Sequence, residues 1–490
     1  MGSIDLTVNQ AGVERAVQRA RERNVVIPTF AQMRAPRLCR DEIKEELRHI
    51  GLYDAHPRNL FRITWHNEPV EKGGGFGEPN YIEFPSSLTG VDARIIALIG
   101  KWFPIGAHKV GAAFACLVPR LVTGQFDPSR QKAVWPSTGN YCRGGAYDSL
   151  LLGCDAVAVV PERMSRERFQ AMERLGCQVL RIPGSESNVK QLLDQCSELR
   201  EAGDHYVVFN QFDEFANYLW HYHVTGGAVE DVLSRVMGPG DEFRGFCAAT
   251  GSAGTVGAGD YLKQVFPASK VTAVEALQCP TMLQNGFGTH HIEGIGDRSV
   301  PWIHNVRNTD VVTAIDDRAV TALGRLFNEP AGRTYLVEQG VSPSAVESLG
   351  LLGFSGIANL LAAVKTARYF ELDRSDVLVT VLTDSMWLYG SRLEEMTLAE
   401  GPYSERQAAI DLHRWLLGQT GDGLLELTYP ERHRVHNLKY FIWVEQQGKS
   451  EDECRAQWYD RHYWTDIQQL VPRIDELIVE FNRRVGILGD

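Results

Sequence analysis

Residues 132–160, KAVWPSTGNYCRGGAYDSLLLGCDAVAVV, contain the pattern that decides the fold. A short apolar run, KAVWP, is followed by a loop of small polar residues, a helix-like stretch and a second apolar run, DAVAVV. Runs that are apolar along their whole length are typical of strands buried on both faces, and a crossover of this length pairs such strands in parallel. The stretch therefore predicts a β–α–β unit.

The same rhythm repeats between about residues 94 and 384. Helices are predicted at 165–176 and 187–203, where apolar residues recur at three- and four-residue spacing and the pattern stops at a glycine. The chain is therefore expected to be an α/β protein with open, mainly parallel sheets. The predicted strands are residues 94–99, 132–136, 155–160, 177–182, 205–209, 245–250, 270–276, 310–314 and 376–382.

Two terminal regions flank this core. Residues 1–80 mix charged helical sequence with a GGGFG loop, and residues 393–490 are rich in Trp, Tyr, Leu and charge without a strand pattern. We expect an N-terminal extension, a core at 81–392 and a mainly helical C-terminal extension. At 490 residues the chain has room for a sizeable buried interior.

Composition limits the possible partners. The formal charge is −12 and no basic stripe stands out, so a nucleic acid partner is not expected. No apolar run is long enough to span a bilayer and no signal-peptide pattern opens the sequence, which favours a cytoplasmic protein without a membrane partner. The nine cysteines include no CxxC, and His433 and His436 lack further ligands at metal-site spacing, so we expect reduced thiols and no metal.

Two glycine-containing loops follow predicted strands, where open parallel sheets bind their ligands. PSTGNYCRGG (136–145) can present backbone N–H groups and polar side chains to a carboxylate, although an ordinary βα turn has the same composition. ATGSAGTVGAG (249–259) can wrap a phosphate at a helix N-terminus. Its glycines are also spaced like a dinucleotide fingerprint, with Glu275 about where a ribose-binding acid would lie. A nicotinamide-dependent reductase is therefore the alternative at this point.

Lys109 begins a helix of small residues in PIGAHKVGAAF (104–114). A single lysine usually lies on the surface, but few charges surround this one. Burial would lower the pKa of its amine and make Schiff-base chemistry accessible. At the end of the last predicted strand, VLTDSMW (381–387) supplies Asp384 and Ser385.

Taken in order, these segments resemble the cysteine synthase and cystathionine β-synthase branch of the tryptophan synthase β-like, or fold type II, pyridoxal-phosphate enzymes. GAHKV resembles the Schiff-base lysine motif, STGN the substrate loop, GSAGT the phosphate cup and TDS the family's Pro-Asp-Ser ending. The resemblance covers about residues 81–392 and depends on the ordered set. It implies two interleaved α/β domains, with a smaller mobile domain at about 130–215 inserted in the larger one, and a homodimer.

The resemblance also implies the chemistry. The cofactor would be pyridoxal 5'-phosphate, and the small-molecule substrate an amino acid of the serine, O-acetylserine or cysteine type. β-Elimination would give an α-aminoacrylate, which is released or adds a thiol-type nucleophile. A cofactor-free binding protein on the same fold is a third interpretation, against which the retained lysine argues. The implied catalytic residue is Lys109; the cofactor contacts are Lys109, Asn140, Gly251, Ser252, Ala253, Gly254, Thr255 and Ser385; the substrate contacts are Ser137, Thr138, Gly139 and Asn140.

Some features depart from the family pattern. Tyr141 replaces the family's second Thr, and both terminal extensions are long, which leaves the substrate and the role of the extensions open. Adjacent strand residues point to opposite faces, so if Ser385 meets the pyridine nitrogen, Asp384 is expected to point away from the site.

Overall fold

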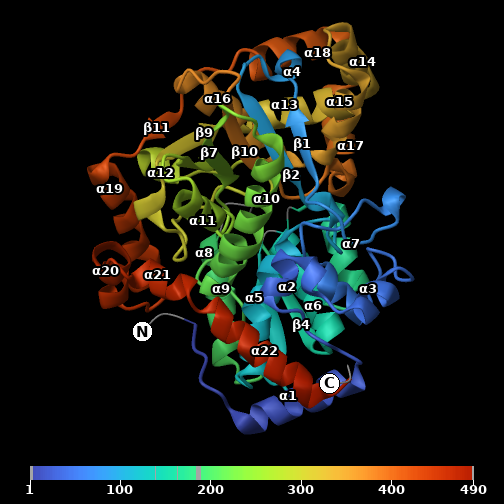
Figure 1. Cartoon of the computed structure of the whole chain (residues 1–490). Coiled ribbons are helices and arrows are strands. Elements are labelled where there is room, and N and C mark those ends of the chain that lie inside the picture. Colours follow the sequence, from blue (N-terminus) through green and yellow to red (C-terminus); the bar gives the residue numbers. More distant parts are fainter. Residues whose placement is uncertain (1–3, 138, 163, 184–188, 488–490) are drawn as a thin grey trace.

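The computed structural model describes residues 4–137, 139–162, 164–183 and 189–487. Two sheets organise this part of the chain, one in the upper and one in the lower half of Figure 1. The larger sheet has the strand order β1-β2-β10-β7-β8-β9-β11, and the smaller sheet has the order β5-β4-β3-β6. All pairings are parallel except those of β1 and β11, so the predicted α/β class with mainly parallel sheets is confirmed.

The larger sheet contains the predicted strands that come before residue 132 and after residue 209 in the chain, which confirms them. Its central strands are buried along nearly their whole length, as the continuous apolar runs indicated. Helix α16, Phe354–Tyr369, packs against β10. The strands are β1 Tyr81–Phe84, β2 Arg94–Ile99, β7 Glu242–Ala249, β8 Lys270–Ala276, β9 Val311–Ile315, β10 Asp376–Leu382 and β11 Leu424–Glu426.

The edge strands β1 and β11 were not predicted. Both are short, antiparallel and partly exposed, so neither has the continuous apolar pattern of the inner strands. The C-terminal extension, in which no strand pattern was found, contains one short strand, because β11 pairs with β9 through Leu424–Thr313 and Glu426–Val311. The C-terminal region therefore completes one edge of the larger sheet.

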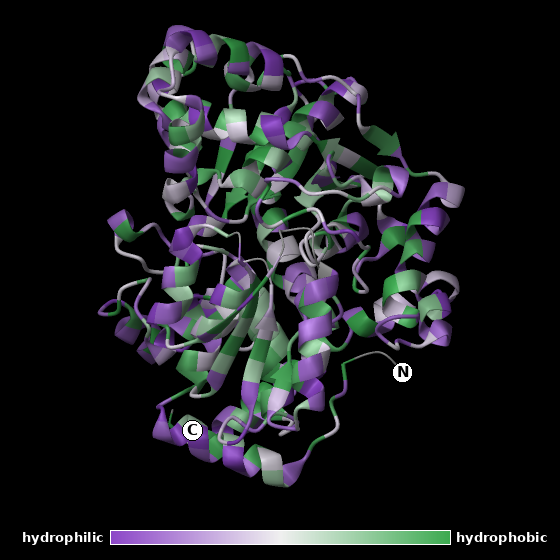
Figure 2. Cartoon of the chain, turned by 180° about the vertical axis from the view of Figure 1, so that it is seen from behind, coloured by the Kyte–Doolittle hydropathy of each residue, from purple (hydrophilic) through white to green (hydrophobic). Residues whose placement is uncertain are grey.

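The smaller sheet consists of four parallel strands at residues 132–208. Helix α6 connects β3 to β4, which confirms the β–α–β unit predicted at residues 132–160. Figure 2 shows apolar strands in the interior and polar residues on the outer helices. The strands are β3 Lys132–Pro136, β4 Asp155–Pro161, β5 Gln178–Ile182 and β6 Tyr206–Val208.

Helices cover both sheets and form most of the terminal regions (Figure 1). The two predicted helices are present as α7 and α8. The α-helices are α1 Gln10–Glu22, α2 Phe30–Arg34, α3 Asp41–Leu47, α4 Ser86–Thr89, α5 Lys109–Val122, α6 Asn140–Leu152, α7 Arg166–Arg174, α8 Val189–Glu201, α9 Phe215–Trp220, α10 Gly226–Val236, α11 Gly257–Val265, α12 Thr281–Gln284, α13 Asp317–Asn328, α14 Pro330–Glu338, α15 Pro343–Ser348, α16, α17 Gly390–Glu400, α18 Glu405–Asp411, α19 Tyr429–Lys439, α20 Glu451–Tyr459, α21 Tyr463–Gln468 and α22 Val471–Val485.

The two ends of the chain pack together. Helices α1 and α22 lie side by side at the bottom of Figure 1, and both contribute buried side chains to the cluster around α5. The side-chain amide of Asn482 donates to the carbonyl of Ile27 and accepts from its N–H, at 2.7 and 3.0 Å. The terminal regions are therefore integrated into the packing around α5.

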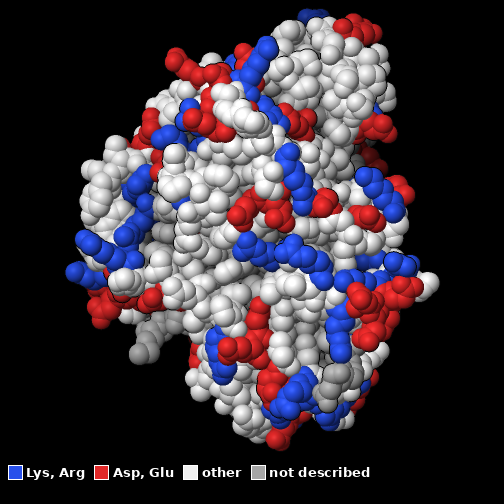
Figure 3. Space-filling model, viewed as in Figure 1, with Lys and Arg blue, Asp and Glu red and all other residues white. Residues whose placement is uncertain are grey.

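The surface mixes both signs of charge. Figure 3 shows acidic and basic side chains interspersed over the visible face. Within the residues that the structure describes, no helix combines the length and apolarity needed to cross a membrane.

Candidate active site

The first element of the site is Lys109, the first residue of α5. Its Nζ donates to Gln211 Oε1 at 3.2 Å and lies 3.5 Å from Ser252 Oγ. The accessible part of the side chain faces an internal cavity rather than the outer surface. The surrounding protein removes water from the amine and lowers its pKa to about 8, with Asp297 partly opposing this effect. Lys109 is therefore easier to deprotonate than an exposed lysine, as the sequence predicted.

The glycine loop predicted to bind phosphate lies between β7 and α11. The backbone N–H groups of residues 252–255 donate to no described residue, so they are available to an anion. A Cβ on Gly251 would lie 3.9 Å from Lys109 Nζ, and one on Gly254 would lie 2.2 Å from Asn217 Oδ1. The loop thus comes close to the lysine and has no room for side chains at these two positions.

Asn217 supports this loop from behind. Its Nδ2 donates to Ser252 Oγ and to the carbonyl of Gln211, both at 3.0 Å. Ala253 takes a left-handed conformation with φ 59°, which sharpens the turn. The short helix α9 therefore helps to hold the loop in position.

A third feature concerns Ser385, which is 1% exposed and whose Oγ has no hydrogen-bond partner among the described residues. A buried hydroxyl without a partner is costly and indicates a missing polar group. Lys109, the free N–H groups of the 252–255 loop and this hydroxyl match, respectively, the aldehyde, phosphate and ring nitrogen of pyridoxal phosphate. The residues present fit the cofactor that the sequence resemblance implied.

The predicted substrate loop connects β3 to α6 and reaches the same cavity. Ser137 and Asn140 line it, and Ser137 Oγ accepts the N–H of Gly139 at 3.1 Å. Gly139 has φ 147°, and a Cβ there would lie 2.5 Å from Arg168 Nη1, so both its conformation and its surroundings require glycine. Thr138 lies outside the described residues.

A buried ionic cluster lies behind this loop. Arg168, from α7, contacts Glu293 at 2.8 Å, Asp384 at 3.6 Å and the hydroxyl of Tyr389 at 2.5 Å. Asp384 accepts from Asn140 Nδ2 at 2.6 Å and from the Tyr389 hydroxyl at 2.8 Å. These contacts link the elements around the smaller sheet to the segment that follows β10.

The expectation that Asp384 points away from the site is wrong. It is fully buried and bonded to Asn140, one of the cavity residues. The reason is local: β10 ends at Leu382, so strand alternation does not extend to Asp384 and Ser385. Asp384 therefore orients a residue of the candidate site.

The structure brings five of the predicted site residues to one cavity: Lys109, Ser137, Asn140, Gly251 and Ser252. The cavity is lined by Lys109, Ser137, Asn140, Tyr141, Gln211, Phe212, Gly251, Ser252, Glu293, Gly294, Asp297, Ser355 and Thr383. Gly139, Ala253, Gly254, Thr255 and Ser385 do not line it, but each belongs to a loop that does. The roles assigned to these residues remain predictions.

Sequence reasoning missed Gln211, which accepts from the lysine amine. It lies three residues after the end of β6, so the rule that ligands bind after the strands of a parallel sheet could have indicated it. Asp297 and Ser355 had no such signal, because they follow no strand and reach the cavity only through the folding of long connections.

The dinucleotide alternative depended on Glu275. Both of its carboxylate oxygens accept backbone N–H groups at 2.9 Å, from Met282 and Leu283 of the short helix α12. The side chain is 2% exposed. Glu275 thus caps a helix instead of facing a ribose, and the nicotinamide-dependent reductase has no support.

Comparisons with known proteins agree with this geometry. The family "Pyridoxal-phosphate dependent enzyme" matches residues 103–384. A probable cysteine synthase of Bacillus subtilis is 27% identical over 298 residues, covering 60% of this chain and 88% of the relative. Cystathionine beta-synthase of Saccharomyces cerevisiae is 24% identical over 316 residues, covering 63% of this chain and 59% of that protein.

Solved structures show the same fold. An O-acetylserine dependent cystathionine beta-synthase from Helicobacter pylori aligns with a TM-score of 0.53 and 24% identity, covering 64% of this chain and 94% of that one. A hydrogen sulfide-producing enzyme from Fusobacterium nucleatum aligns with a TM-score of 0.55 and 21% identity, covering 71% and 95%. The core therefore has the tryptophan synthase β-like fold, and the terminal regions lie largely outside the shared part.

Proposed function

This chain belongs to the pyridoxal-phosphate dependent enzymes, and on that premise we propose that it replaces or eliminates a substituent at the β-carbon of an amino acid. The proposed substrates are of the serine, O-acetylserine or cysteine type, with sulfide or another thiol as the nucleophile in the replacement reaction. Relatives named cysteine synthase and cystathionine beta-synthase support this reaction class.

One observation carries the proposal: the amine of Lys109 lies within 3.5 Å of Ser252, at the start of a loop whose N–H groups are free. The lysine amine and a loop suited to anion binding thus lie beside the same cavity. The glycine loop of a dinucleotide-binding fold works without a lysine, and a lysine enzyme without a cofactor would not need the loop.

Each residue then has a role in the proposed reaction. The bound cofactor supplies the electron sink for the reacting carbon. We propose that the N–H groups of the 252–255 loop bind the phosphate, and that Ser137 and Asn140 orient the substrate carboxylate. Lys109 Nζ holds the cofactor covalently at rest and afterwards carries the proton between the α-carbon and the medium.

The surroundings of Lys109 suit this proton transfer. A pKa of about 8 keeps a useful fraction of the amine unprotonated near neutral pH, whereas an unperturbed lysine would be almost wholly protonated. Gln211 and Ser252, its two hydrogen-bond neighbours, are uncharged and do not hold the proton as a carboxylate would.

The proposed cofactor attachment is tested by spectroscopy. Purified protein should show a visible absorption band that borohydride removes, and peptide mapping after reduction should place the label on Lys109. A colourless protein after incubation with pyridoxal phosphate, or a label on another lysine, would refute the assignment.

The reaction class is tested separately with substrates. Serine, O-acetylserine and cysteine should be screened for 2-oxo acid release, and each again with sulfide or homocysteine for the replacement product. Turnover without any change at the β-carbon, for example transamination or racemisation alone, would contradict the proposed chemistry.

We further propose that the chain divides at 1–80, 81–392 and 393–490, with a smaller domain at about 130–215 inserted in the core. We also propose that the protein is a homodimer and that it is located in the cytoplasm. The described cysteines are all buried and unpaired, which suits a reducing compartment. Light scattering of the holoenzyme would test the dimer, and limited proteolysis the domain boundaries.

A further inference from the structure

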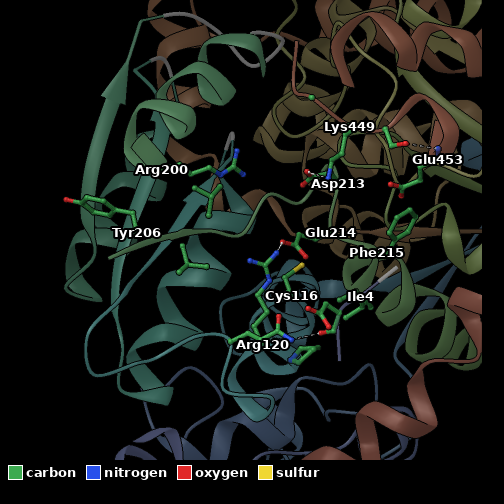
Figure 4. A pocket seen from close by; sticks show the side chains of 18 residues that line it. Ile4, Cys116, Arg120, Arg200, Tyr206, Asp213, Glu214, Phe215, Lys449 and Glu453 are labelled. Atoms are coloured by element: carbon green, nitrogen blue, oxygen red, sulfur yellow. Dashed lines mark hydrogen bonds and ion pairs between the residues drawn. The ribbon is translucent and has the colours of Figure 1, made fainter. Parts of the chain in front are cut away.

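A second cavity, of about 660 Å³, lies on the other side of the segment that carries Gln211. Its walls come from α5, the edge strand β6, residues 213–216 and residues 448–453 at the start of α20, with Ile4, Asp5, Gln125 and Arg200 completing the lining (Figure 4). We propose that this cavity binds a free α-amino acid as an effector, and that binding is coupled to the position of Lys109. Binding itself is independent of the proposed function, and only its effect on turnover rests on it.

The charges in the cavity favour a zwitterion. Two ion pairs cross it: Arg120 with Glu214, and Lys449 with Asp213 at 2.8 Å. Arg200, an exposed residue near the end of α8, also lines the cavity and forms no ion pair with a described residue, and Figure 4 shows its guanidinium turned toward Asp213. One cation is thus available for a carboxylate group.

The two acids can receive an ammonium group. Glu214 uses Oε1 for Arg120, and Asp213 uses Oδ2 for Lys449, which leaves the second oxygen of each carboxylate without a described hydrogen-bond partner. An anion without an ammonium group would meet both carboxylates and be repelled. An α-amino acid places a carboxylate and an ammonium group side by side and satisfies both.

The edge of the smaller sheet offers further partners. The N–H of Lys132 donates to the carbonyl of His205, and the N–H of Phe209 donates to the carbonyl of Val134. The backbone groups of His205 and Phe209, which flank β6, therefore face β3. The backbone groups of Tyr206 and Val208 consequently turn toward the open edge, where they have no described partner. Such N–H groups can bind the carboxylate together with Arg200.

Apolar surface completes the site. Pro119, Val207 and Phe215 line the same cavity as the charged groups. A ligand side chain of apolar or thioether type can therefore pack beside the ion pairs, and the volume is ample for one of methionine size.

The first link to the active site is the short segment at residues 211–215. Asp213, Glu214 and Phe215 line the effector cavity, whereas Gln211 and Phe212 line the active-site cavity. Gln211 accepts from the lysine amine at 3.2 Å. A ligand that moves Asp213 and Glu214 therefore shifts the hydrogen-bond partner of Lys109.

Helix α5 forms a second connection. Lys109 is its first residue, and Cys116 and Arg120 reach the effector cavity two to three turns later. A ligand that contacts Arg120 and residues 213–216 thus acts on both segments that position the catalytic amine. Both segments thus offer a contiguous path between the two sites, and the coupling itself is measured below.

Binding can be tested on the cofactor-loaded enzyme with L-methionine as the probe. Calorimetry is combined with borohydride reduction and peptide mapping at each point of one titration, because an amino acid in the active site displaces Lys109 from the cofactor, whereas one in the effector cavity leaves Lys109 attached. We expect a heat signal that saturates while the reduced label stays on Lys109.

Matched variants locate that signal. Arg200→Gln should raise the Kd of L-methionine at least tenfold. Lys190→Gln, which removes a charge from the same helix outside the cavity, should leave that Kd within twofold of the wild type. N-acetyl-L-methionine and L-methionine amide each lack one charge and should each bind at least tenfold more weakly. Absence of a binding event that leaves Lys109 attached to the cofactor, an unchanged signal in Arg200→Gln, or equal binding of either blocked probe would overturn the proposal.

The coupling needs its own measurement. L-methionine should slow amide hydrogen exchange at residues 210–217 in the wild type but not in Arg200→Gln, and should change the KM of the amino-acid substrate about fivefold or more. Unchanged exchange in this segment despite binding would refute the coupling. The exchange and calorimetric results can be read even if the proposed reaction is wrong.

Discussion

Replacing Gly254 by alanine tests the proposed phosphate loop with a single methyl group. A Cβ at this position would lie 2.2 Å from Asn217 Oδ1, far inside van der Waals contact. The backbone of Gly254 is not in the left-handed region, so alanine adds no conformational strain. The effect of the substitution is therefore the displacement of Asn217.

The expected loss of cofactor affinity depends on the two hydrogen bonds that Asn217 donates. The side chain is 1% exposed and cannot turn into solvent, so moving it breaks the bonds of Nδ2 to Ser252 Oγ and to the Gln211 carbonyl. A hydrogen bond contributes about 0.5–1.5 kcal/mol net, so two lost bonds amount to about 1–3 kcal/mol. If that loss falls on the bound state, the Kd for pyridoxal phosphate rises about five- to 150-fold.

Equilibrium dialysis of the apoenzyme against pyridoxal phosphate measures this Kd. Gly238→Ala is the matched control, because a Cβ there meets only Asp241 Oδ2, at 3.9 Å, and its Kd should stay within twofold. Asn217→Ala should match the Gly254→Ala loss, and the double variant should be no worse than Asn217→Ala alone. A Kd within twofold of wild type for Gly254→Ala would refute the placement of the phosphate.

Four further predictions concern the lysine and the buried charges. Lys109→Ala should abolish the borohydride-sensitive band and reduce turnover at least 1000-fold, measured as 2-oxo acid release, and a normal band would refute its role. In the apoenzyme, the rate of covalent cofactor attachment should rise with pH through about 8, since the neutral amine reacts; a midpoint near 10 in stopped-flow absorbance would contradict the lowered pKa. Ser385→Asp should shift the cofactor's absorption and slow elimination, because an anion raises the pKa of the ring nitrogen; identical spectra and rates would mean that Ser385 does not touch it. Arg168→Met should destabilise the protein by about 3–5 kcal/mol in chemical denaturation, since it leaves Asp384 buried without its ion-pair partner and Glu293 with Arg392 alone, and Asp384→Asn in that background should recover part of the loss; an unchanged midpoint would refute this.

The strands predicted with the right bounds are buried along nearly their whole length, whereas the partly buried edge strands β5 and β6 were predicted one and two residues too long. Residues 94–99, 132–136, 270–276 and 376–382 match the observed strands at both ends, because a continuous apolar run bounded by polar residues leaves little choice of boundary. The edge strands β1 and β11 could not be predicted, since they form only through pairing with β2 and β9. Local sequence does not contain that information.

The candidate site was predictable to the extent that it lies in loops after strands. Lys109, Asn140 and Ser252 all lie in or directly after such loops, and the structure brings them to one cavity. Gln211 follows the same rule and was missed because its loop has no unusual composition. The partners of Arg168 were beyond prediction, because Glu293 and Asp384 lie 125 and 216 positions further along the chain.

Those long-range contacts limit what Asn140 can do. Its Oδ1 accepts from Arg143 at 2.8 Å and one N–H of its amide is donated to Asp384, so the side chain cannot rotate without breaking buried bonds. One N–H remains for the cavity. In this arrangement Asn140 can donate to the substrate carboxylate or to the cofactor's ring oxygen, but not to both, which narrows the double role implied by the sequence resemblance. Asp384 then determines which way the remaining N–H points, and acts as a positioning residue for the site, although it does not line the cavity itself.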